Sequence, residues 1–453
     1  MTSPYHHSLT IREQLCYGCT HCMKKCPTYA IRIEKGHAKV DPSRCIDCGQ
    51  CMQACPHHAI GVEQTPFELL FSFKQRVAVI PTVFFSQFED SITNKQVALA
   101  LYDIGFTHIY FAEIGVDIMK HLGLQNPDSV QKPMISNFCP AIIRLIRTRY
   151  PGLCDHLSRL RSPGEIAAIF ARAEVNDQYP DHSENGIFYI TPCPAKISEF
   201  KTEEGNHGRL EGVFDGVLNM DTVFNKVSNS ISKNKKRFSS ELCAEPELPF
   251  TTAGASKWSL INGEKQPNAS RRLGIDEIHQ VIDFLEYVEE DDDMNIDFLE
   301  FKACAEGCTG GILCTRNKFL AKERIQHLAS QLPETLPEIV KTRIDKFADF
   351  LRANALEPDN MEDHAIKLDE DMETAIHKME KIRKITSALP GIDCGLCGAP
   401  TCSELAHDIA QGGASIRQCT VLRLKDPKEL NTLSRIWGEK KVAPESDSQS
   451  NVL

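Results

Sequence analysis

The residues best suited to chemistry in this chain are its cysteines, which number 19 among 453 residues. Two segments near the N-terminus, CYGCTHCMKKCP and CIDCGQCMQACP, share the spacing C-x2-C-x2-C-x3-C-P. Three thiolates on one such loop can bind three irons of a cubane, and the fourth ligand then comes from the other segment. The spacing therefore predicts two [4Fe–4S] clusters. One is assigned to Cys16, Cys19, Cys22 and Cys55, and the other to Cys26, Cys45, Cys48 and Cys51.

A pair of structural zinc sites is the alternative for these cysteines. Zinc sites usually consist of two C-x2-C pairs, whereas each segment here has four cysteines and ends in Cys-Pro. Iron–sulfur ligation is therefore favoured. Throughout its length, the segment 1–65 resembles the bacterial two-cluster ferredoxins, and this resemblance implies electron transfer. Cluster ligation would also replace the core that so short a segment cannot build.

Four further cysteines occur in three short segments that are far apart in the chain. The segments are SNFCP with Cys139, PCPAK with Cys193, and CAEGCTGG with Cys304 and Cys308. The two later segments follow expected strands at 186–193 and 294–304, and ligands of open α/β sheets bind beyond the carboxyl ends of strands. Cys139 precedes a helical pattern, whose positive N-terminal end favours a thiolate. These positions therefore suit a ligand site.

In this order, the three segments resemble the signature motifs of the [FeFe]-hydrogenase catalytic domain, over about residues 66–320. The resemblance implies that a cubane is held by Cys139, Cys193, Cys304 and Cys308. It further implies that Cys308 bridges the cubane to a di-iron subcluster with CO, cyanide and dithiolate ligands, which completes the H-cluster. Lys196 would donate to a cyanide ligand, and Gly310 and Gly311 would let the backbone approach the cofactor closely. The substrates would be H2 and protons.

Several positions depart from the family's motifs. Phe138 stands where the family has a cysteine that donates protons, and a phenyl ring cannot relay a proton. The segment 115–124 corresponds to the one that supplies relay glutamates in fast enzymes, and we find no carboxylate pair in it. Thr191 and Lys302 replace methionines of the family, and Cys314 ends the glycine-containing segment. Because these changes spare the four ligands, we expect a slow hydrogenase with an altered proton route.

A last set of cysteines lies near the C-terminus, with the spacing C-x2-C-x4-C-x16-C. It comprises Cys394, Cys397, Cys402 and Cys419. The segment resembles the single-[4Fe–4S] modules of some membrane electron-transfer and corrinoid proteins, with zinc as the alternative. Such a module behind a hydrogenase domain resembles the sensory-type [FeFe]-hydrogenases that lack a PAS domain. The cysteines left without a ligand role are Cys154, Cys243 and Cys314.

The hydrophobic pattern predicts the elements that position these motifs. A strand at 76–85, a helix at 94–105 and a strand at 107–115 form a βαβ unit, which implies a parallel sheet. Together with the resemblances, this gives an α/β fold class with a ferredoxin-like domain, a two-lobed hydrogenase domain, a helical connector and a small Fe–S module. A basic segment at 228–241 is expected to be an exposed loop. The expected boundaries are 1–65 for the ferredoxin domain, 66–325 for the hydrogenase domain, 326–385 for the connector, 386–425 for the C-terminal module and 426–453 for a partly disordered tail.

The composition, with 42% hydrophobic and 25% charged residues, is typical of a globular protein. A formal net charge of −11 argues against general binding of nucleic acid. No apolar run reaches the roughly 20 residues that a membrane span needs, and the N-terminal residues lack the pattern of a signal peptide. We therefore expect a cytoplasmic protein.

Together, the motifs predict a reversible hydrogenase that relays electrons through [4Fe–4S] clusters. Its expected partners are a ferredoxin or another redox protein, the maturation enzymes that build the H-cluster, and a signalling or electron-transfer protein. Two alternatives remain: a non-catalytic iron–sulfur electron-transfer or scaffold protein, and the catalytic subunit of a larger electron-confurcating complex. The chain has no G-x-G-x-x-G dinucleotide motif, so a confurcating role would need other subunits.

Overall fold

A computed structural model describes residues 7–206, 213–238, 250–264, 270–290, 295–357 and 366–425, together with residues 428, 432, 435 and 436. The chain divides into two compact units. Unit 1 consists of Met1–Thr10, Pro42–Gln53 and Ile60–Ala365, and unit 2 consists of Ile11–Asp41, Ala54–Ala59 and Ile366–Leu453. The first cysteine loop therefore belongs to unit 2. Of the second loop, Cys45, Cys48 and Cys51 belong to unit 1 and Cys55 to unit 2. Cys243 lies outside the described residues.

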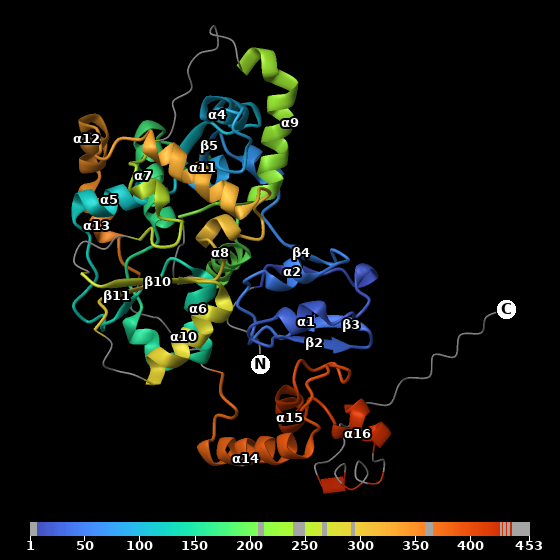
Figure 1. Cartoon of the computed structure of the whole chain (residues 1–453). Coiled ribbons are helices and arrows are strands. Elements are labelled where there is room, and N and C mark those ends of the chain that lie inside the picture. Colours follow the sequence, from blue (N-terminus) through green and yellow to red (C-terminus); the bar gives the residue numbers. More distant parts are fainter. Residues whose placement is uncertain are drawn as a thin grey trace, which may run out of the picture. The chain divides into compact units, whose positions relative to one another are not determined.

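The first lobe of unit 1 is built on a four-stranded parallel sheet with the order β6-β5-β8-β9 (Figure 1). Val77 of β5 is in register with His108 on one side and with Ile187 on the other. All residues of β8 are buried, as expected for a parallel strand that is covered on both faces. The strands are β5 (Gln75–Ile80), β6 (His108–Phe111), β8 (Asn185–Thr191) and β9 (Gly216–Asn219). The helices between and after them are α4 (Asn94–Asp103), α5 (Ile114–Leu122), α7 (Pro163–Gln178), α8 (Pro194–Asn206) and α9 (Met220–Phe238).

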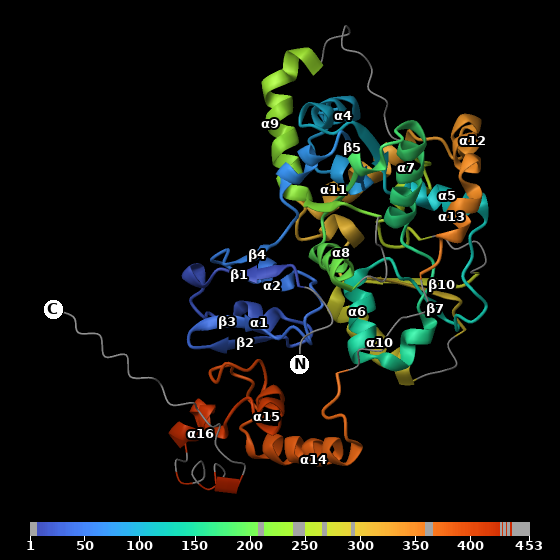
Figure 2. The same cartoon turned by 180° about the vertical axis from the view of Figure 1, so that it is seen from behind.

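The second lobe of unit 1 contains a three-stranded parallel sheet with the order β10-β11-β7 (Figure 2). Its core includes Leu145, Leu285 and Phe301, one from each of two helices and the central strand. The elements are β7 (Met134–Ile135), α6 (Pro140–Arg149), β10 (Arg272–Asp276), α10 (Ile278–Glu290) and β11 (Phe298–Lys302). The two parallel sheets confirm the predicted α/β fold class.

Three helices that follow the second lobe pack back onto the first. They are α11 (Lys318–Ser330), α12 (Glu338–Lys346) and α13 (Ala348–Ala353). Ile325, Ile344 and Leu351 from these helices are buried in the core of the first lobe. Much of the expected connector therefore contributes to the packing of unit 1, and the expected domain boundaries stay a prediction.

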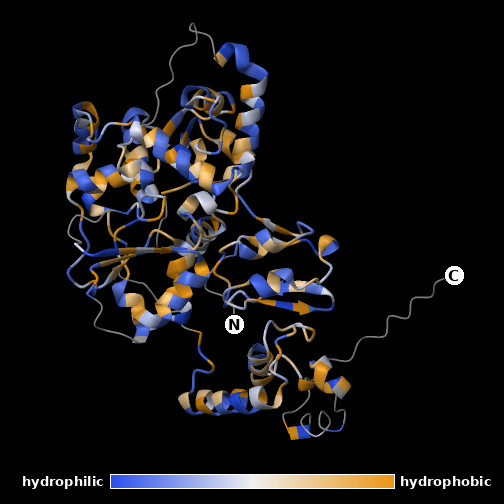
Figure 3. Ribbon diagram, in the orientation of Figure 1, coloured by the Kyte–Doolittle hydropathy of each residue, from blue (hydrophilic) through white to orange (hydrophobic). Residues whose placement is uncertain are grey.

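The structure corrects two expected elements. The strand predicted at 76–85 ends at Ile80, because Pro81 introduces the short helix α3 (Thr82–Phe85). The basic segment 228–241, expected to be a loop, continues α9 as far as Phe238. Hydrophobic residues are interleaved with the charged ones along this helix (Figure 3), and Ile231 among them is buried against the first lobe.

Unit 2 combines the first cysteine loop with the C-terminal module. A hairpin of β2 and β3 pairs Ile31 with Val40 in antiparallel register. The C-terminal module has a small core of its own, which includes Ile385, Leu405 and Ile416. The elements of unit 2 include α1 (His21–Lys25), β2 (Ile31–Glu34), β3 (His37–Val40), α14 (Met372–Ala388), α15 (Cys402–Ala410) and α16 (Thr420–Lys425). Among the described residues, no helix has the length and hydropathy that crossing a membrane requires.

Candidate functional site

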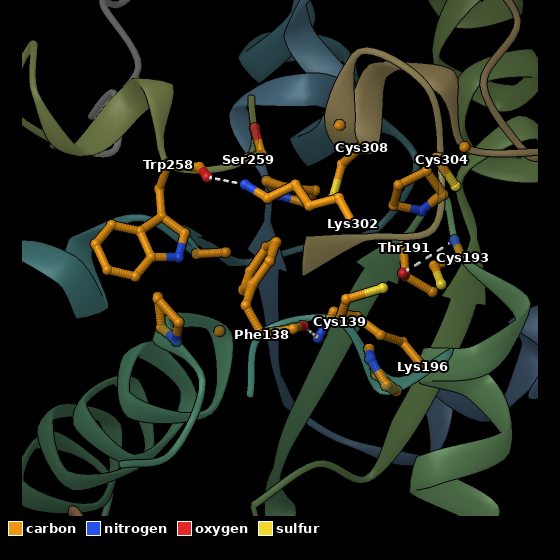
Figure 4. Close-up of a pocket in the computed structure, with 18 of the residues that line it drawn as sticks. Phe138, Cys139, Thr191, Cys193, Lys196, Trp258, Ser259, Lys302, Cys304 and Cys308 are labelled. Carbon is orange, nitrogen blue, oxygen red and sulfur yellow. Dashed lines mark hydrogen bonds between the residues drawn. The ribbon is translucent and has the colours of Figure 1, made fainter. Parts of the chain in front are cut away.

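Four cysteines from distant parts of the chain line one cavity of unit 1 (Figure 4). They are Cys139, Cys193, Cys304 and Cys308. The cavity measures about 690 Å³, counting space that is open to solvent. The sequence motifs predicted these four residues as the ligands of one cluster, and the structure brings them together.

Each of these cysteines stands at the end of a regular element. Cys139 caps the N-terminus of α6, and Cys193 lies between the end of β8 and the start of α8. Cys304 follows β11, and Cys308 belongs to the short 3-10 turn Gly307–Gly310. Strand ends and helix starts thus supply the site, as is usual in open α/β sheets.

The surroundings of these thiols favour a positively charged ligand. Burial, followed by the charge on Cys139, raises the pKa of Cys193 to about 11. Burial also raises the pKa of Cys308 to about 12, although Lys302 acts in the opposite direction. Clustered thiolates are unfavourable by themselves, and bound iron compensates their charge. The four sulfur donors therefore fit an iron–sulfur cubane.

Lys196 lines the same cavity and is the third residue of α8, which begins at Pro194. Its Nζ donates to the carbonyl oxygen of Phe138 at 3.3 Å and lies 5.0 Å from the centre of the Phe138 ring. Burial alone would lower the pKa of this lysine, but the neighbouring Tyr189 and Glu199 raise it above its ordinary value. The ammonium therefore stays charged, and it can bind an anionic group in the cavity.

Lys302 is a second lysine against the ring of Phe138, with its Nζ 5.1 Å from the ring centre, and it is buried. Its ammonium donates to the carbonyl oxygens of Trp258 and Leu260, both at 2.7 Å. It also lies 2.8 Å from Oε1 of Glu300. A hydrogen-bonded cation therefore occupies the position at which the resemblance leads one to expect methionine.

Glu264 extends this network away from the cavity. Its Oε1 lies 3.6 Å from Nζ of Lys302, and Oγ of Ser136 donates to its Oε2 at 2.6 Å. Burial raises the pKa of Glu264 to about 7, although Lys302 acts to lower it. A carboxyl group with this pKa can take up and release a proton near neutral pH. Sequence reasoning missed Glu264 and Glu300, because residues so far apart in the chain meet only in the fold.

A second buried carboxyl group, Glu113, lines the cavity itself. Its two oxygens accept hydrogen bonds from the backbone N–H of Thr82 at 2.9 and 3.0 Å, and Oγ1 of Thr82 donates at 2.9 Å. Burial raises its pKa to about 7, against the lowering by Thr82. Asp117, one helical turn later, is also buried and accepts a hydrogen bond from Oγ1 of Thr252 at 2.6 Å.

The segment 115–124 itself contains one carboxylate, Asp117, so the expectation that it holds no carboxylate pair stands. A pair forms only together with a residue just before the segment. Glu113 precedes that segment and Asp117 lies within it, four residues later. The charge on Asp117 contributes to the raised pKa of Glu113. The E-x3-D spacing at the start of a helix could have identified the pair, because residues four apart share a helix face.

The two glycines of the third motif have different surroundings. Gly311 lines the cavity, and a Cβ atom there would lie 2.9 Å from both Cβ and O of Pro192. A Cβ atom at Gly310 would lie 2.1 Å from the carbonyl oxygen of Ala305. The turn itself therefore requires glycine at 310, and its role in cofactor approach stays a prediction. Cys314 is half-buried, and its thiol donates to the carbonyl oxygen of Cys308 at 3.4 Å, so it supports this turn.

Three thiols of the first ferredoxin-like loop and one thiol of the second loop group together within unit 2. They are Cys16, Cys19, Cys22 and Cys55. Burial, followed by the charges of the other three thiols, raises the pKa of Cys22 to about 11. The backbone N–H of Ala38 donates to Sγ of Cys16, and the N–H of Ala59 donates to Sγ of Cys55, each at 3.3 Å. This is the grouping that the spacing predicted for one cluster.

Most of the second loop lies in unit 1, beside the cavity. The charge on Cys48 contributes to the raised pKa of Cys304, after burial and the larger effects of Cys193, Cys139 and Cys308. A Cβ atom at Gly49 would lie 2.7 Å from Cγ2 of Ile312, so the loop approaches the end of the third motif closely. The three cysteines of this part of the loop are Cys45, Cys48 and Cys51. Cys26 belongs to unit 2, and its assignment to the same cluster stays a prediction.

The C-terminal cysteines also share one cavity, of about 310 Å³. The four residues are Cys394, Cys397, Cys402 and Cys419. Burial raises the pKa of Cys397, and the charges on Cys419 and Cys394 add to this effect. The carboxylate of Asp393 accepts a hydrogen bond from the backbone N–H of Cys402 at 2.7 Å and fixes the loop. Four converging sulfur donors fit a [4Fe–4S] cluster here as well.

Three family models match separate parts of the chain. Residues 74–230 match the model described as iron only hydrogenase large subunit, C-terminal domain. Residues 8–56 match a 4Fe-4S dicluster domain, and residues 389–421 match a family described as an Fe-S cluster.

Curated relatives match shorter parts. A subunit of the ion-translocating oxidoreductase complex from Rhodobacter capsulatus is 44% identical over 39 residues, which are 9% of this chain and 21% of the relative. The corresponding protein from Azoarcus sp. (strain BH72) is 41% identical over 68 residues, which are 13% of this chain and 37% of the relative. The chain thus spans about a fifth to just over a third of the length of these relatives.

Solved structures of [FeFe]-hydrogenase HydA1 from Chlamydomonas reinhardtii match a larger share of this chain than the curated relatives do. Two variants, one of them in the apo form, are each 15% identical in sequence, and the match covers 64% of this chain and 94% of theirs. The TM-scores are 0.42 and 0.44.

Proposed function

We propose that the iron-only hydrogenase domain of this chain, which stands between a 4Fe–4S dicluster domain and an Fe–S module, interconverts H2 with two protons and two electrons at an H-cluster. The observation that supports this most directly is the convergence of four cysteines on one cavity that also contains a buried lysine. The H-cluster supplies the chemistry of H2 binding and cleavage when it is bound.

The residues around the cavity would hold this group in defined ways. The four thiolates would hold the cubane, and Cys308 would also hold the di-iron subcluster. The charged Nζ of Lys196 would donate a hydrogen bond to an anionic cyanide ligand of this group, an interaction that is strong away from water. Gly311 keeps the wall of the cavity clear, because a larger residue there would press on Pro192.

Proton transfer would follow polar residues that surround Phe138. Lys302 brings a cation to the cavity, and Glu264 receives or supplies the proton on its outer side. Glu113 offers a second acceptor in the cavity wall. The position of the family's proton-donating cysteine is occupied by Phe138, which cannot donate. Each turnover would therefore depend on a longer route, and this supports a slow enzyme.

Electron transfer would use the cluster of the second ferredoxin-like loop. The charge interaction between Cys48 and Cys304, both of which belong to unit 1, supports this. A ferredoxin or another redox protein would exchange electrons with the chain. We further propose a sensory-type role in the cytoplasm, after maturation enzymes have inserted the di-iron subcluster, with the redox state of the clusters as the output to a signalling partner.

Isotope exchange tests this function without a partner protein. Matured full-length protein under D2 in ordinary water should release HD slowly, and the Cys193→Ala variant should release none. A wild-type protein that carries CO and cyanide infrared bands but produces no HD would contradict the proposed catalysis.

The second candidate function is a non-catalytic electron relay. Phe138 favours this function, because its ring faces Lys196 and Lys302 at the position where the family has a proton-donating cysteine. A relay would show reducible [4Fe–4S] clusters but neither the infrared bands nor HD release after maturation.

A further inference from the structure

Arg32 on strand β2 binds the C-terminal module within unit 2. Its Nε donates to Oδ2 of Asp408 at 2.6 Å and its Nη2 donates to Oδ1 at 3.0 Å, so the guanidinium binds this carboxylate with two hydrogen bonds. Nη2 also donates to Oε2 of Glu404 at 2.7 Å. Both acidic residues lie on α15, the helix that begins at Cys402.

These ion pairs are shielded from water on the arginine side. The side chain of Arg32 is 14% exposed, and those of Glu404 and Asp408 are 16% and 24% exposed. Nη1 of Arg32 donates to the carbonyl oxygen of Tyr29 at 2.6 Å, which anchors the guanidinium to its own loop. A planar fork with this many partners suits arginine and not lysine.

Strand β2 and the C-terminal loop that contains Cys397 are in direct backbone contact. The N–H of Ile33 donates to the carbonyl oxygen of Gly398 at 2.9 Å, so Gly398 extends the edge of β2. A Cβ atom at Gly398 would lie 2.2 Å from the carbonyl oxygen of Ile33. Gly398 has φ +87°, and it immediately follows the ligand candidate Cys397. Glycine is therefore required here both by conformation and by the close approach.

A second contact joins positions next to ligand candidates on both sides. A Cβ atom at Gly395 would lie 3.0 Å from Cε of Met23, which is fully buried. Met23 follows Cys22, and Gly395 follows Cys394. Residues adjacent to the cysteines of two different clusters therefore touch, with no further layer of side chains between them.

We propose that this contact is the electron-exchange interface between the dicluster domain and the C-terminal cluster, and that Arg32 holds the module in place for it. One electron leaves the reduced cluster of one module and reduces the oxidised cluster of the other by one electron. The inference rests on the proposed function for its electron source, since H2 oxidation in unit 1 supplies the electrons and releases the protons. The C-terminal cluster is then the outer end of the relay.

The charged groups around the contact determine how firmly the C-terminal module is docked. Arg32 binds two acidic residues from one helix face, so removal of its charge leaves Glu404 and Asp408 close together without the cation between them. Removing a set of charge-assisted hydrogen bonds should lower the ratio of docked to undocked module by roughly tenfold or more. The exchange rate of the Ile33 amide reports this ratio directly, because its N–H is bonded across the interface.

The test compares the Arg32→Ala variant with the Lys39→Ala variant in the full chain with its clusters. Lys39 belongs to the same hairpin and pairs with Glu34 on the exposed surface, so it is the matched control. The clusters are reduced chemically with dithionite, which makes the test independent of hydrogenase activity. Spin–spin interaction between the C-terminal cluster and the dicluster domain is measured by electron paramagnetic resonance, and amide exchange is measured by mass spectrometry.

We expect the wild type and Lys39→Ala to show spin–spin interaction and a protected Ile33 amide. Arg32→Ala should lose the interaction and exchange this amide about tenfold faster or more. The double variant Glu404→Gln, Asp408→Asn should behave in the same way, and it covers the case in which Arg32→Ala does not fold. The proposal is overturned if the wild type shows no interaction between these clusters, or if both charge variants keep the interaction and the protection. Loss of HD release with intact spin–spin interaction would instead contradict only the proposed hydrogenase function.

Discussion

Lys302 and Glu300, two positions apart on β11, form a buried ion pair with 2.8 Å between Nζ and Oε1. Residues two apart on a strand share a face, so both side chains point to the same side of the sheet. Both are 2–3% exposed, and a pair so deeply buried persists only when its remaining donors are bonded. The carbonyl oxygens of Trp258 and Leu260 supply these partners. The sheet thereby holds a cation against Phe138.

The first prediction concerns the proton route beyond Lys302. Glu264→Gln keeps the shape of the side chain but removes its ability to exchange a proton. We expect HD release to fall roughly tenfold to a hundredfold while the infrared bands of the cofactor stay unchanged. Glu286→Gln is the control, because Glu286 pairs with Arg149 on the surface. Equal rates in both variants would show that protons do not pass Glu264.

The second prediction concerns pH and Glu113. Burial raises its pKa from the ordinary 4.5 to about 7, so the folded state favours the neutral acid. Its contribution to stability is therefore present below about pH 4.5 and is lost as the pH rises through about 7. The glutamine of Glu113→Gln stays neutral at every pH, so this variant should not show the loss. In the wild type, the loss in free energy of unfolding between low pH and pH above 7 is on the order of 3 kcal/mol.

Denaturant unfolding of unit 1 at about pH 5 and about pH 8 measures this difference. Glu338→Gln provides the control, since Glu338 is exposed and forms an ion pair with the nearby Lys341 on the same helix. The assignment is contradicted if the wild type and Glu113→Gln lose the same stability over this range.

The third prediction concerns the attachment of the second cysteine loop. Nη1 of Arg144 on α6 donates to Oδ2 of the fully buried Asp47 at 2.5 Å, and His7 bonds the same oxygen at 2.7 Å. Arg144→Ala leaves a buried carboxylate poorly compensated, which costs roughly 3–5 kcal/mol. Faster amide exchange in residues 45–51 and reduced iron content should follow. Arg149→Ala, at an exposed position of the same helix, should change neither; similar effects in both variants would exclude a specific role for the buried pair.

The fourth prediction concerns the C-terminal cluster. Cys402→Ser should lower the iron content by about four atoms per chain, because one [4Fe–4S] cluster is lost. The infrared bands of the cofactor in unit 1 should remain. Cys154→Ser, which changes a cysteine outside every predicted ligand set, should keep all of its iron. Unchanged iron in Cys402→Ser, or zinc in place of iron in the wild type, would refute the assignment.

The spacing of the cysteines predicted the ferredoxin-like and C-terminal ligand sets, because ligand number and loop geometry are local properties of the chain. Cys139, Cys193, Cys304 and Cys308 could be placed at one site only through strand ends and the family's motifs. Glu264 escaped prediction because its role depends on contact with Lys302, which no local pattern encodes.

The two elements that were predicted wrongly also have physical explanations. The strand at 76–85 was extended too far because Phe84 and Phe85 continue the apolar run after Pro81, although they lie in a buried helix. The basic residues of 228–241 suggested a loop, whereas the spaced apolar residues of α9 pack on the first lobe. Burial of a few residues outweighed the charge of their neighbours in this segment.

Infrared spectroscopy combined with iron analysis of the matured full-length protein tests the central claim most directly. An H-cluster in the four-cysteine cavity predicts bands of bound CO and cyanide together with about 18 iron atoms per chain. Stable protein with the iron of its [4Fe–4S] clusters, but without these bands after repeated maturation, would contradict it.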